Sequence, residues 1–224
     1  MKLYKTKLMK KIIIIAAILV SIAKIGTAQD SNLETDNREK FHVGLKAGLN
    51  YSNVYDEQGA EFNADAKFGL VGGLFLGIPI GKYLGVQPEV LISQKGFRGN
   101  GSILGSSYSF TRTTTYVDIP LQFQLKPSEF ITLLAGPQFS YLVNQRDVFT
   151  NTIVSYEQEQ EFKNDNIRKN IFGVVGGIDI NLKHIILGAR VAWDVQNNHG
   201  DGTMNTPRYK NVWVQGTIGY AFYK

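Results

Sequence analysis

The segment VDIPLQFQLK, residues 117–126, alternates apolar and polar side chains over its whole length. Its apolar members share one parity: Val117, Ile119, Leu121, Phe123 and Leu125. Strict alternation with period two is typical of a β-strand that has one apolar and one polar face. Seven further runs of this kind occur in the 224-residue chain, which shows no helical periodicity of useful length. We therefore predict an all-β domain with eight strands at residues 41–51, 68–78, 83–94, 117–125, 130–143, 170–181, 184–196 and 211–223.

The connections between these predicted strands alternate between short and long. Three are tight turns with suitable turn residues, at 79–82, 126–129 and 181–183. Four are long and polar, at about 52–67, 97–107, 144–169 and 197–210. Bacterial outer-membrane barrels have this arrangement, with short periplasmic turns and longer outer loops. A soluble sandwich gives no reason for the long loops to gather at one end.

Two kinds of closed barrel contain such strands, and they differ in which face is apolar. A soluble barrel of lipocalin type is apolar inside, whereas a membrane barrel is apolar outside. Here the polar face combines many glycines with a few charges of both signs, unlike a solvated face rich in Lys, Glu and Thr. Glycine leaves room for long paired side chains, and the interior of an eight-stranded barrel is just filled by side chains.

We therefore predict an eight-stranded antiparallel up-and-down transmembrane β-barrel of OmpA/OmpX-like architecture, with a packed polar lumen. The predicted structural charge network of the lumen comprises Lys46, Glu89, Asp118, Asp179, Arg190 and Asp194.

The aromatic residues of the apolar face support a membrane barrel. Those near the long-loop ends of their strands are Tyr51, Phe68, Tyr141, Phe172 and Trp193. Those near the opposite rim are Phe41, Tyr220 and Phe222. Two aromatic rings separated by an aliphatic band match the interfacial girdles of membrane barrels.

Three prolines lie inside predicted strands, namely Pro88, Pro120 and Pro137. Proline cannot donate a ladder hydrogen bond, and a closed barrel has no edge strand to accommodate it. Because the three lie at similar height on neighbouring strands, we predict a seam with bulges or missing ladder bonds where the wall bends.

The amino-terminal segment has the composition of a cleavable secretory signal peptide. A lysine-rich start precedes an apolar run at 12–22 and small residues at 26–28. The run is shorter than the roughly 20 residues of a membrane-spanning helix, and the alternative is an uncleaved amino-terminal anchor. The predicted organisation is a signal peptide at 1–28, a short polar segment at 29–40 and the barrel domain at 41–224.

The positive charge of the chain is concentrated in the predicted signal peptide. The whole chain has a net charge of +5, but cleavage after Ala28 leaves 18 basic and 19 acidic residues, a net charge of −1. Nucleic-acid binding therefore loses its main support. The absence of cysteine excludes disulfides, thiolate metal sites and a cysteine nucleophile.

Four segments carry a family resemblance: GLKAGLNYS at 44–52, QPEVL at 87–91 with KG at 95–96, YVDIPL at 116–121, and AGP at 135–137. In this order and spacing they resemble the recurring segments of the PorT-like outer-membrane β-barrel proteins of Bacteroidetes. The resemblance runs from about Phe41 to the end of the chain. It implies an eight-stranded outer-membrane barrel and, through the namesake of the family, an accessory role in protein secretion.

An enzymatic barrel would need a nucleophile or base at the membrane rim. We place His42 and His184 at the periplasmic rim as ordinary interface residues, which leaves His199 as the outer candidate. His199 lies in a Gly- and Asp-containing segment that a turn explains, and with Asp194 and Asp201 it makes only a weak metal site. We expect no catalytic residue, no cofactor and no bound metal.

The expected function is that of a non-enzymatic outer-membrane protein, an interaction or envelope-integrity component and more specifically an accessory to secretion. The alternatives are a narrow passive pore, which requires a continuous water path, and a lipid-modifying enzyme. Expected partners are outer-membrane lipid, lipopolysaccharide, and secretion or envelope proteins, because loops on a rigid scaffold commonly carry recognition. The oligomeric state does not follow from the sequence.

Overall fold

The computed structural model describes residues 36–58, 63–103, 106–151, 155–160, 168–199 and 208–223. The predicted signal peptide at 1–28 lies outside these residues, and the polar segment at 29–40 is described from Asp36 onward. No helix in the described ranges is long and apolar enough to cross a membrane. The described strands are β1 (His42–Gln58), β2 (Asn63–Pro79), β3 (Leu84–Ile103), β4 (Ser106–Leu125), β5 (Ile131–Asn151), β6 (Ser155–Gln160), β7 (Asn170–Leu182), β8 (Ile185–Asp194) and β9 (Arg208–Tyr223).

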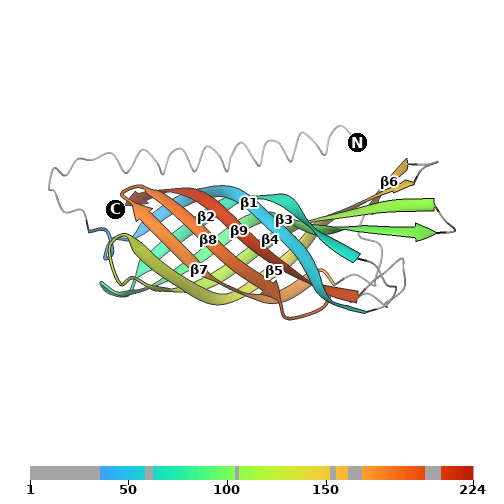
Figure 1. The fold of residues 1–224 in the computed structure, drawn as a ribbon. Coiled ribbons are helices and arrows are strands. Elements are labelled where there is room, and N and C mark those ends of the chain that lie inside the picture. Colours follow the sequence, from blue (N-terminus) through green and yellow to red (C-terminus); the bar gives the residue numbers. More distant parts are fainter. Residues whose placement is uncertain are drawn as a thin grey trace, which may run out of the picture.

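Eight of these strands form one closed antiparallel barrel (Figure 1). Each barrel strand pairs with the next, with β7 following β5, and the pairing of β1 with β9 joins the first strand to the last. In the described part of the chain, β6 pairs only with β5, at residues 145–150 of β5. β7 pairs with residues 131–141 of the same strand. The predicted all-β, eight-stranded antiparallel architecture is confirmed.

Three of the predicted outer loops are wrong in extent, because much of each is strand. β3 and β4 remain paired up to Ile103 and Ser106, within the predicted loop at 97–107. β5 continues to Asn151 and pairs with β6 within the predicted loop at 144–169, and β1 and β2 extend into 52–67. Beyond the lipid, no apolar face is required, so the alternation disappears, while the β-branched residues Thr111 and Thr113 to Thr115 still favour extended backbone.

We call the strand region beyond the outer aromatic girdle the projecting sheet. It consists of residues 98–103 of β3, 106–111 of β4, 148–151 of β5 and all of β6. These strands extend past the barrel at the end opposite the carboxyl terminus (Figure 1).

The apolar face of the barrel wall points outward and the polar face points inward. On β1, Leu45 and Leu49 are 47% and 50% exposed, whereas Lys46 and Asn50 between and beside them are buried. Exposed and buried residues alternate along the whole of β8. This is the inverse of a water-soluble barrel and fits a wall that contacts lipid.

The aromatic residues expected in the two girdles lie on this outer face. Seven of them are exposed, and Phe222 is half-buried. Tyr51 and Phe68 are directly paired across β1 and β2, with ring centroids 4.9 Å apart. The stretch from Phe41 to Tyr51 matches the length of about 9–11 residues with which a tilted strand crosses a bilayer.

Strand pairing is interrupted at the prolines. Between β3 and β4 it stops at Pro88 and resumes at Leu91. Between β4 and β5 it is interrupted between Pro120 and Phe123, opposite Pro137. The register is the same on both sides of each gap, so ladder bonds are missing without any inserted residue.

The bulges lie elsewhere, nearer the outer end of the barrel. The register shifts between Ala66 and Val71 of β2, and between Thr115 and Tyr116 of β4. The prediction of missing ladder bonds at the prolines is therefore correct and that of bulges there is wrong. Proline removes a hydrogen-bond donor but adds no residue to its strand.

We expect the amides flanking the three prolines to exchange with solvent faster than amides at similar height in β8 and β9. One missing hydrogen bond is worth about 1 kcal/mol, so the difference should be roughly fivefold or more. Hydrogen–deuterium exchange of the folded barrel in detergent measures it. Uniform protection along β3, β4 and β5 would contradict a seam.

Candidate functional site

Two ion pairs lie inside the half of the barrel nearer the start of β1. The Lys46 ammonium donates to Glu89 Oε1 at 2.6 Å, which joins β1 to β3. The Arg190 guanidinium donates to Asp179 Oδ2 at 2.8 Å and to Gln122 Oε1 at 3.1 Å, which joins β8 to β7 and β4. The four ionised side chains are each at most 5% exposed. Four of the six charges assigned to the lumen from sequence thus form two pairs.

A second tier of the lumen is centred on Lys95, which is 1% exposed. Its ammonium lies 3.0 Å from Asp118 Oδ1 and 3.4 Å from Ser140 Oγ. The same nitrogen lies 3.7 Å from the ring centroid of Trp213 and 4.6 Å from that of Tyr116. One cation therefore connects β3 with β4, β5 and β9 through a carboxylate, a hydroxyl and two aromatic faces.

Asp194, the sixth predicted lumen charge, bonds to an amide side chain rather than to a cation. Its Oδ2 accepts from Asn211 Nδ2 at 2.5 Å and from the Asn211 backbone N–H at 3.4 Å. Its Oδ1 is buried without a hydrogen-bond partner among the described residues. Asp194 therefore links β8 to β9 near the outer end of the barrel.

Sequence analysis missed three interior charges, Lys95, Arg112 and Asp147. Arg112 binds Asp147 through two hydrogen bonds, Nε to Oδ1 at 2.9 Å and Nη2 to Oδ2 at 2.8 Å. Lys95 has the parity of Glu89, and Arg112 has that of Asp118. Extending the predicted strands outward would have placed Lys95 and Arg112 on the inner face.

Two glycines make close approaches possible within the wall. A Cβ at Gly177 would lie 2.1 Å from the Ala189 carbonyl oxygen and 2.6 Å from Arg190 Cδ, so glycine is needed for this close approach of β7 to β8. Gly96 has a φ of +143°, a conformation that other residues rarely adopt. Its N–H donates to Ser52 Oγ and its carbonyl accepts from the same hydroxyl, both at 2.9 Å, which ties the distorted part of β3 to β1.

The outer end of the lumen is occupied by an apolar cluster. Val54, Phe97 and Tyr209 are buried against one another, and Phe110 packs beside them. The Arg112 guanidinium lies 5.2 Å from the Phe110 ring centroid. Side chains from β1, β3, β4 and β9 thus meet across the axis at this end.

We expect Glu89→Gln to lower the free energy of unfolding by about 3–5 kcal/mol, because it leaves the buried Lys46 ammonium unpaired. The double variant Lys46→Met/Glu89→Leu should recover most of this loss, since it removes both charges. Urea unfolding of the barrel, followed by the heat-sensitive mobility of the folded form on a gel, measures both. Equal losses in the single and double variants would show that the charge pair is not what stabilises this tier.

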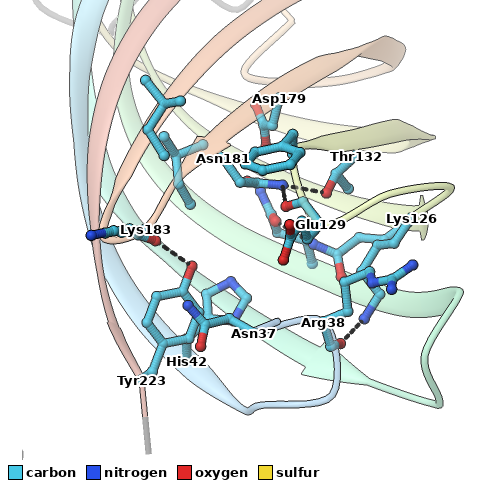
Figure 2. Close-up of a pocket in the computed structure, with 15 residues that line it drawn as sticks. Asn37, Arg38, His42, Lys126, Glu129, Thr132, Asp179, Asn181, Lys183 and Tyr223 are labelled. Atoms are coloured by element: carbon cyan, nitrogen blue, oxygen red, sulfur yellow. Dashed lines mark hydrogen bonds between the residues drawn. The ribbon is translucent and has the colours of Figure 1, made fainter. Parts of the chain in front are cut away.

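A cavity of about 320 Å³ opens at the end of the barrel where β1 begins and β9 ends (Figure 2). Its polar lining includes Gln87, Gln124, Lys126, Glu129, Thr132 and Asn181. Asn181 Nδ2 donates to Thr132 Oγ1 at 2.9 Å, and the Tyr223 hydroxyl donates to the Lys183 carbonyl at 3.0 Å (Figure 2). Polar groups from β3, β4, β5, β7 and β9 and from the turn between β4 and β5 thus line one cavity.

Residues 36–41, which we call the strap, lie at the mouth of this cavity. The Lys126 ammonium donates to the Arg38 carbonyl (Figure 2). The Arg38 guanidinium donates to Asp36 Oδ2 at 2.6 Å and lies 5.4 Å from the Tyr83 ring centroid.

The hydrogen bond from Arg38 lowers the pKa of the Asp36 carboxyl to about 2, against a smaller opposing effect of burial. Burial lowers the pKa of Lys126, and the nearby Arg38 charge adds to this.

The strap should stay ordered from neutral pH down to about pH 4 and loosen as the pH falls toward 2. The pKa of Asp36 is lower in the folded chain than its ordinary value of 3.8, so its contribution is complete above that value and is lost through protonation. A nitroxide on Glu39→Cys, in a chain without native cysteine, reports the mobility of the strap. Asp36→Asn should be mobile already at pH 7, and a spectrum identical to that of the parent would contradict the assignment.

The three histidines lie where the sequence suggests. His42 and His184 are at the end of the barrel where β1 begins, 5.0 Å from the Tyr223 ring and stacked 5.4 Å from the Tyr220 ring respectively. His199 lies at the outer end with Nε2 2.8 Å from Arg168 Nη2, in a left-handed conformation (φ 69°) that suits a turn. Among the described residues no group of three or more potential ligands is placed to hold a metal, and Asp201 lies outside them.

An apolar outer face with exposed aromatic residues and a lumen that contains ion pairs define a transmembrane β-barrel. The chain belongs to the outer membrane protein beta-barrel domain family, whose sequence profile matches residues 27–200. Its place is therefore the outer membrane. No curated protein matches the sequence.

Several solved structures are similar to this chain. Ail of Yersinia pestis, in complex with the heparin analogue sucrose octasulfate, is 13% identical, with 82% of this chain and 99% of Ail covered and a TM-score of 0.45. OprG of Pseudomonas aeruginosa is 13% identical, with 85% and 99% covered and a TM-score of 0.43. The outer membrane protease OmpT of Escherichia coli is 10% identical, with 84% and 97% covered and a TM-score of 0.39. At such values the ligands and activities of these proteins say nothing about this chain.

Proposed function

We propose that this barrel is a non-enzymatic interaction or envelope-integrity component whose binding surface is the projecting sheet. The observation that carries the proposal is the continuation of β3, β4 and β5 well beyond the outer girdle, where β6 adds a further strand. Backbone paired in this way holds a surface more rigidly than free loops would. A rigid surface binds with a smaller loss of conformational entropy.

The filled lumen supports a scaffold rather than the alternative of a passive pore. Lys95, Trp213 and Phe97 are each at most 2% exposed and lie inside the barrel at successive heights. Eight strands enclose little more than the volume of such side chains. A continuous water path would require several buried ion pairs to separate, which is costly in a medium of low dielectric constant.

The alternative of a lipid-modifying enzyme finds little support in the described residues. His199, the outer candidate, is exposed and bonds to a guanidinium. A catalytic base is normally oriented by an acid and placed beside a nucleophile. The hydrogen bond from Arg168 instead occupies the ring nitrogen that would accept a proton.

The proposal also includes a role in secretion, the partners of the protein and its export by a signal peptide. The resemblance to PorT-like proteins supports an accessory role in protein secretion, with secretion or envelope proteins and lipopolysaccharide as partners. A cleavable signal peptide at residues 1–28 would export the chain. Arg98 and Thr150 of the projecting sheet are exposed and suit a protein or glycolipid surface, because water reaches them at little cost in the unbound state.

A photo-reactive amino acid at Thr111, in the projecting sheet, should cross-link to discrete proteins in intact cells. The same group at Leu121, which is 45% exposed on the lipid-facing wall, is the matched control and should capture lipid and bulk membrane protein only. Mass spectrometry identifies the products. Identical products at both positions, or discrete single-channel conductance of the purified barrel, would contradict a binding scaffold.

A further inference from the structure

Five charged residues line the cavity at the base of the barrel: Arg38, Lys126, Glu129, Asp179 and Lys183. Two of opposite charge, Lys126 and Glu129, do not pair with each other. Lys126 and Glu129 lie three residues apart around the turn from β4 to β5, and both line the cavity. Among the described residues, the Glu129 carboxylate forms no ion pair or hydrogen bond and interacts only electrostatically with the Arg38 guanidinium. The Lys126 ammonium bonds to the Arg38 carbonyl. Figure 2 shows the carboxylate of Glu129 directed into the open space.

These charged groups have unused hydrogen-bonding capacity. An ammonium has three donors, and Lys126, which is only 6% exposed, uses one of them on a carbonyl. A carboxylate has about four acceptor sites, and those of Glu129 remain available. A charged group that is partly removed from water and not fully paired raises the free energy of the folded protein. A ligand of complementary charge would therefore be stabilised here.

The remaining walls suit a small polar molecule. Asn181 and Thr132 provide amide and hydroxyl groups on one side, and the His42 and Tyr223 rings provide flat surfaces on another (Figure 2). His42 Nδ1 lies 3.2 Å from the Lys40 carbonyl, so Nδ1 carries the hydrogen and Nε2 remains an acceptor. The volume of about 320 Å³ lies at the lower end of the range for ligand sites, about 300–1,000 Å³.

We propose that this cavity binds a small zwitterion of amino-acid or dipeptide size, with the ligand ammonium on Glu129 and the ligand carboxylate on Lys126. The strap lies at the mouth and shares Lys126 through the Arg38 carbonyl, so an entering carboxylate adds a second acceptor to that ammonium. Above the cavity Arg190 bonds to Asp179 and, across the lumen, to Gln122, so buried side chains lie between the cavity and the rest of the lumen. The site lies at the opposite end from the projecting sheet and does not depend on the scaffold role.

The test uses the full folded barrel in detergent at pH 7 and four probes. The zwitterionic dipeptide Ala-Ala is compared with its N-acetylated form, its C-terminal amide and glucose, by ligand-detected NMR titration. Because a charge-assisted hydrogen bond contributes about a factor of ten or more, each capped dipeptide should bind at least tenfold more weakly. Glucose, which has the polarity but not the charges, should bind no better than the capped forms.

Two variants assign the charges. Glu129→Gln should lose the preference for the free over the acetylated amine, and Lys126→Met should lose the preference for the free carboxylate over the amide. Lys169→Gln, at the outer end of the barrel, is the matched control and should bind all four probes as the parent does. Heat-dependent gel mobility establishes that each variant is folded.

Equal binding of all four probes by the parent, or no binding of Ala-Ala at millimolar concentration, would overturn the proposal. Unchanged discrimination in folded Glu129→Gln would overturn the assigned role of that carboxylate. These outcomes are separate from the cross-linking result, because that experiment probes the outer end only.

Discussion

A backbone that crosses hydrocarbon must satisfy its hydrogen bonds within the protein, because lipid tails offer neither donors nor acceptors. In this chain the pairings of β1 with β9 and of β4 with β5 remove the remaining edges. Closure also separates two environments, lipid outside and a narrow lumen inside. The outward placement of Leu and the inward placement of Lys and Glu on the same strand follow from that separation.

The interior depends on closure in its turn. Arg190 on β8 reaches Gln122 on β4 across the lumen, a contact that exists only in the closed barrel, and Lys46 reaches Glu89 across β2. Glycine at 177 makes space for the Arg190 side chain. The prolines of β3 to β5 remove backbone hydrogen bonds between these neighbouring strands. The ion pairs of Glu89 and Asp118 add side-chain contacts to the same strands.

The barrel is filled with side chains at its centre, and its two accessible ends differ in shape. The outer end continues as paired strands above an apolar cluster around Phe97 and presents a broad surface. The inner end is concave, with a strap held by Lys126 and with the Glu129 carboxylate in the lining of the cavity. A broad paired surface suits a macromolecule, whereas a cavity of about 320 Å³ suits a small molecule.

Sequence by itself determined the strand character, the antiparallel order, the inversion of the two faces and the interior position of Lys46, Glu89 and Arg190. Period-two alternation carries this information because lipid and lumen impose opposite demands on successive residues. Only the tertiary structure decided the length of the outer strands, the partner of each buried charge and the presence of the basal cavity. Outside the lipid the alternation is absent, so the sequence does not mark where these strands end. The contacts of Lys95 with Asp118 and Trp213 depend on the relative heights of β3, β4 and β9 in the barrel, which the sequence does not give.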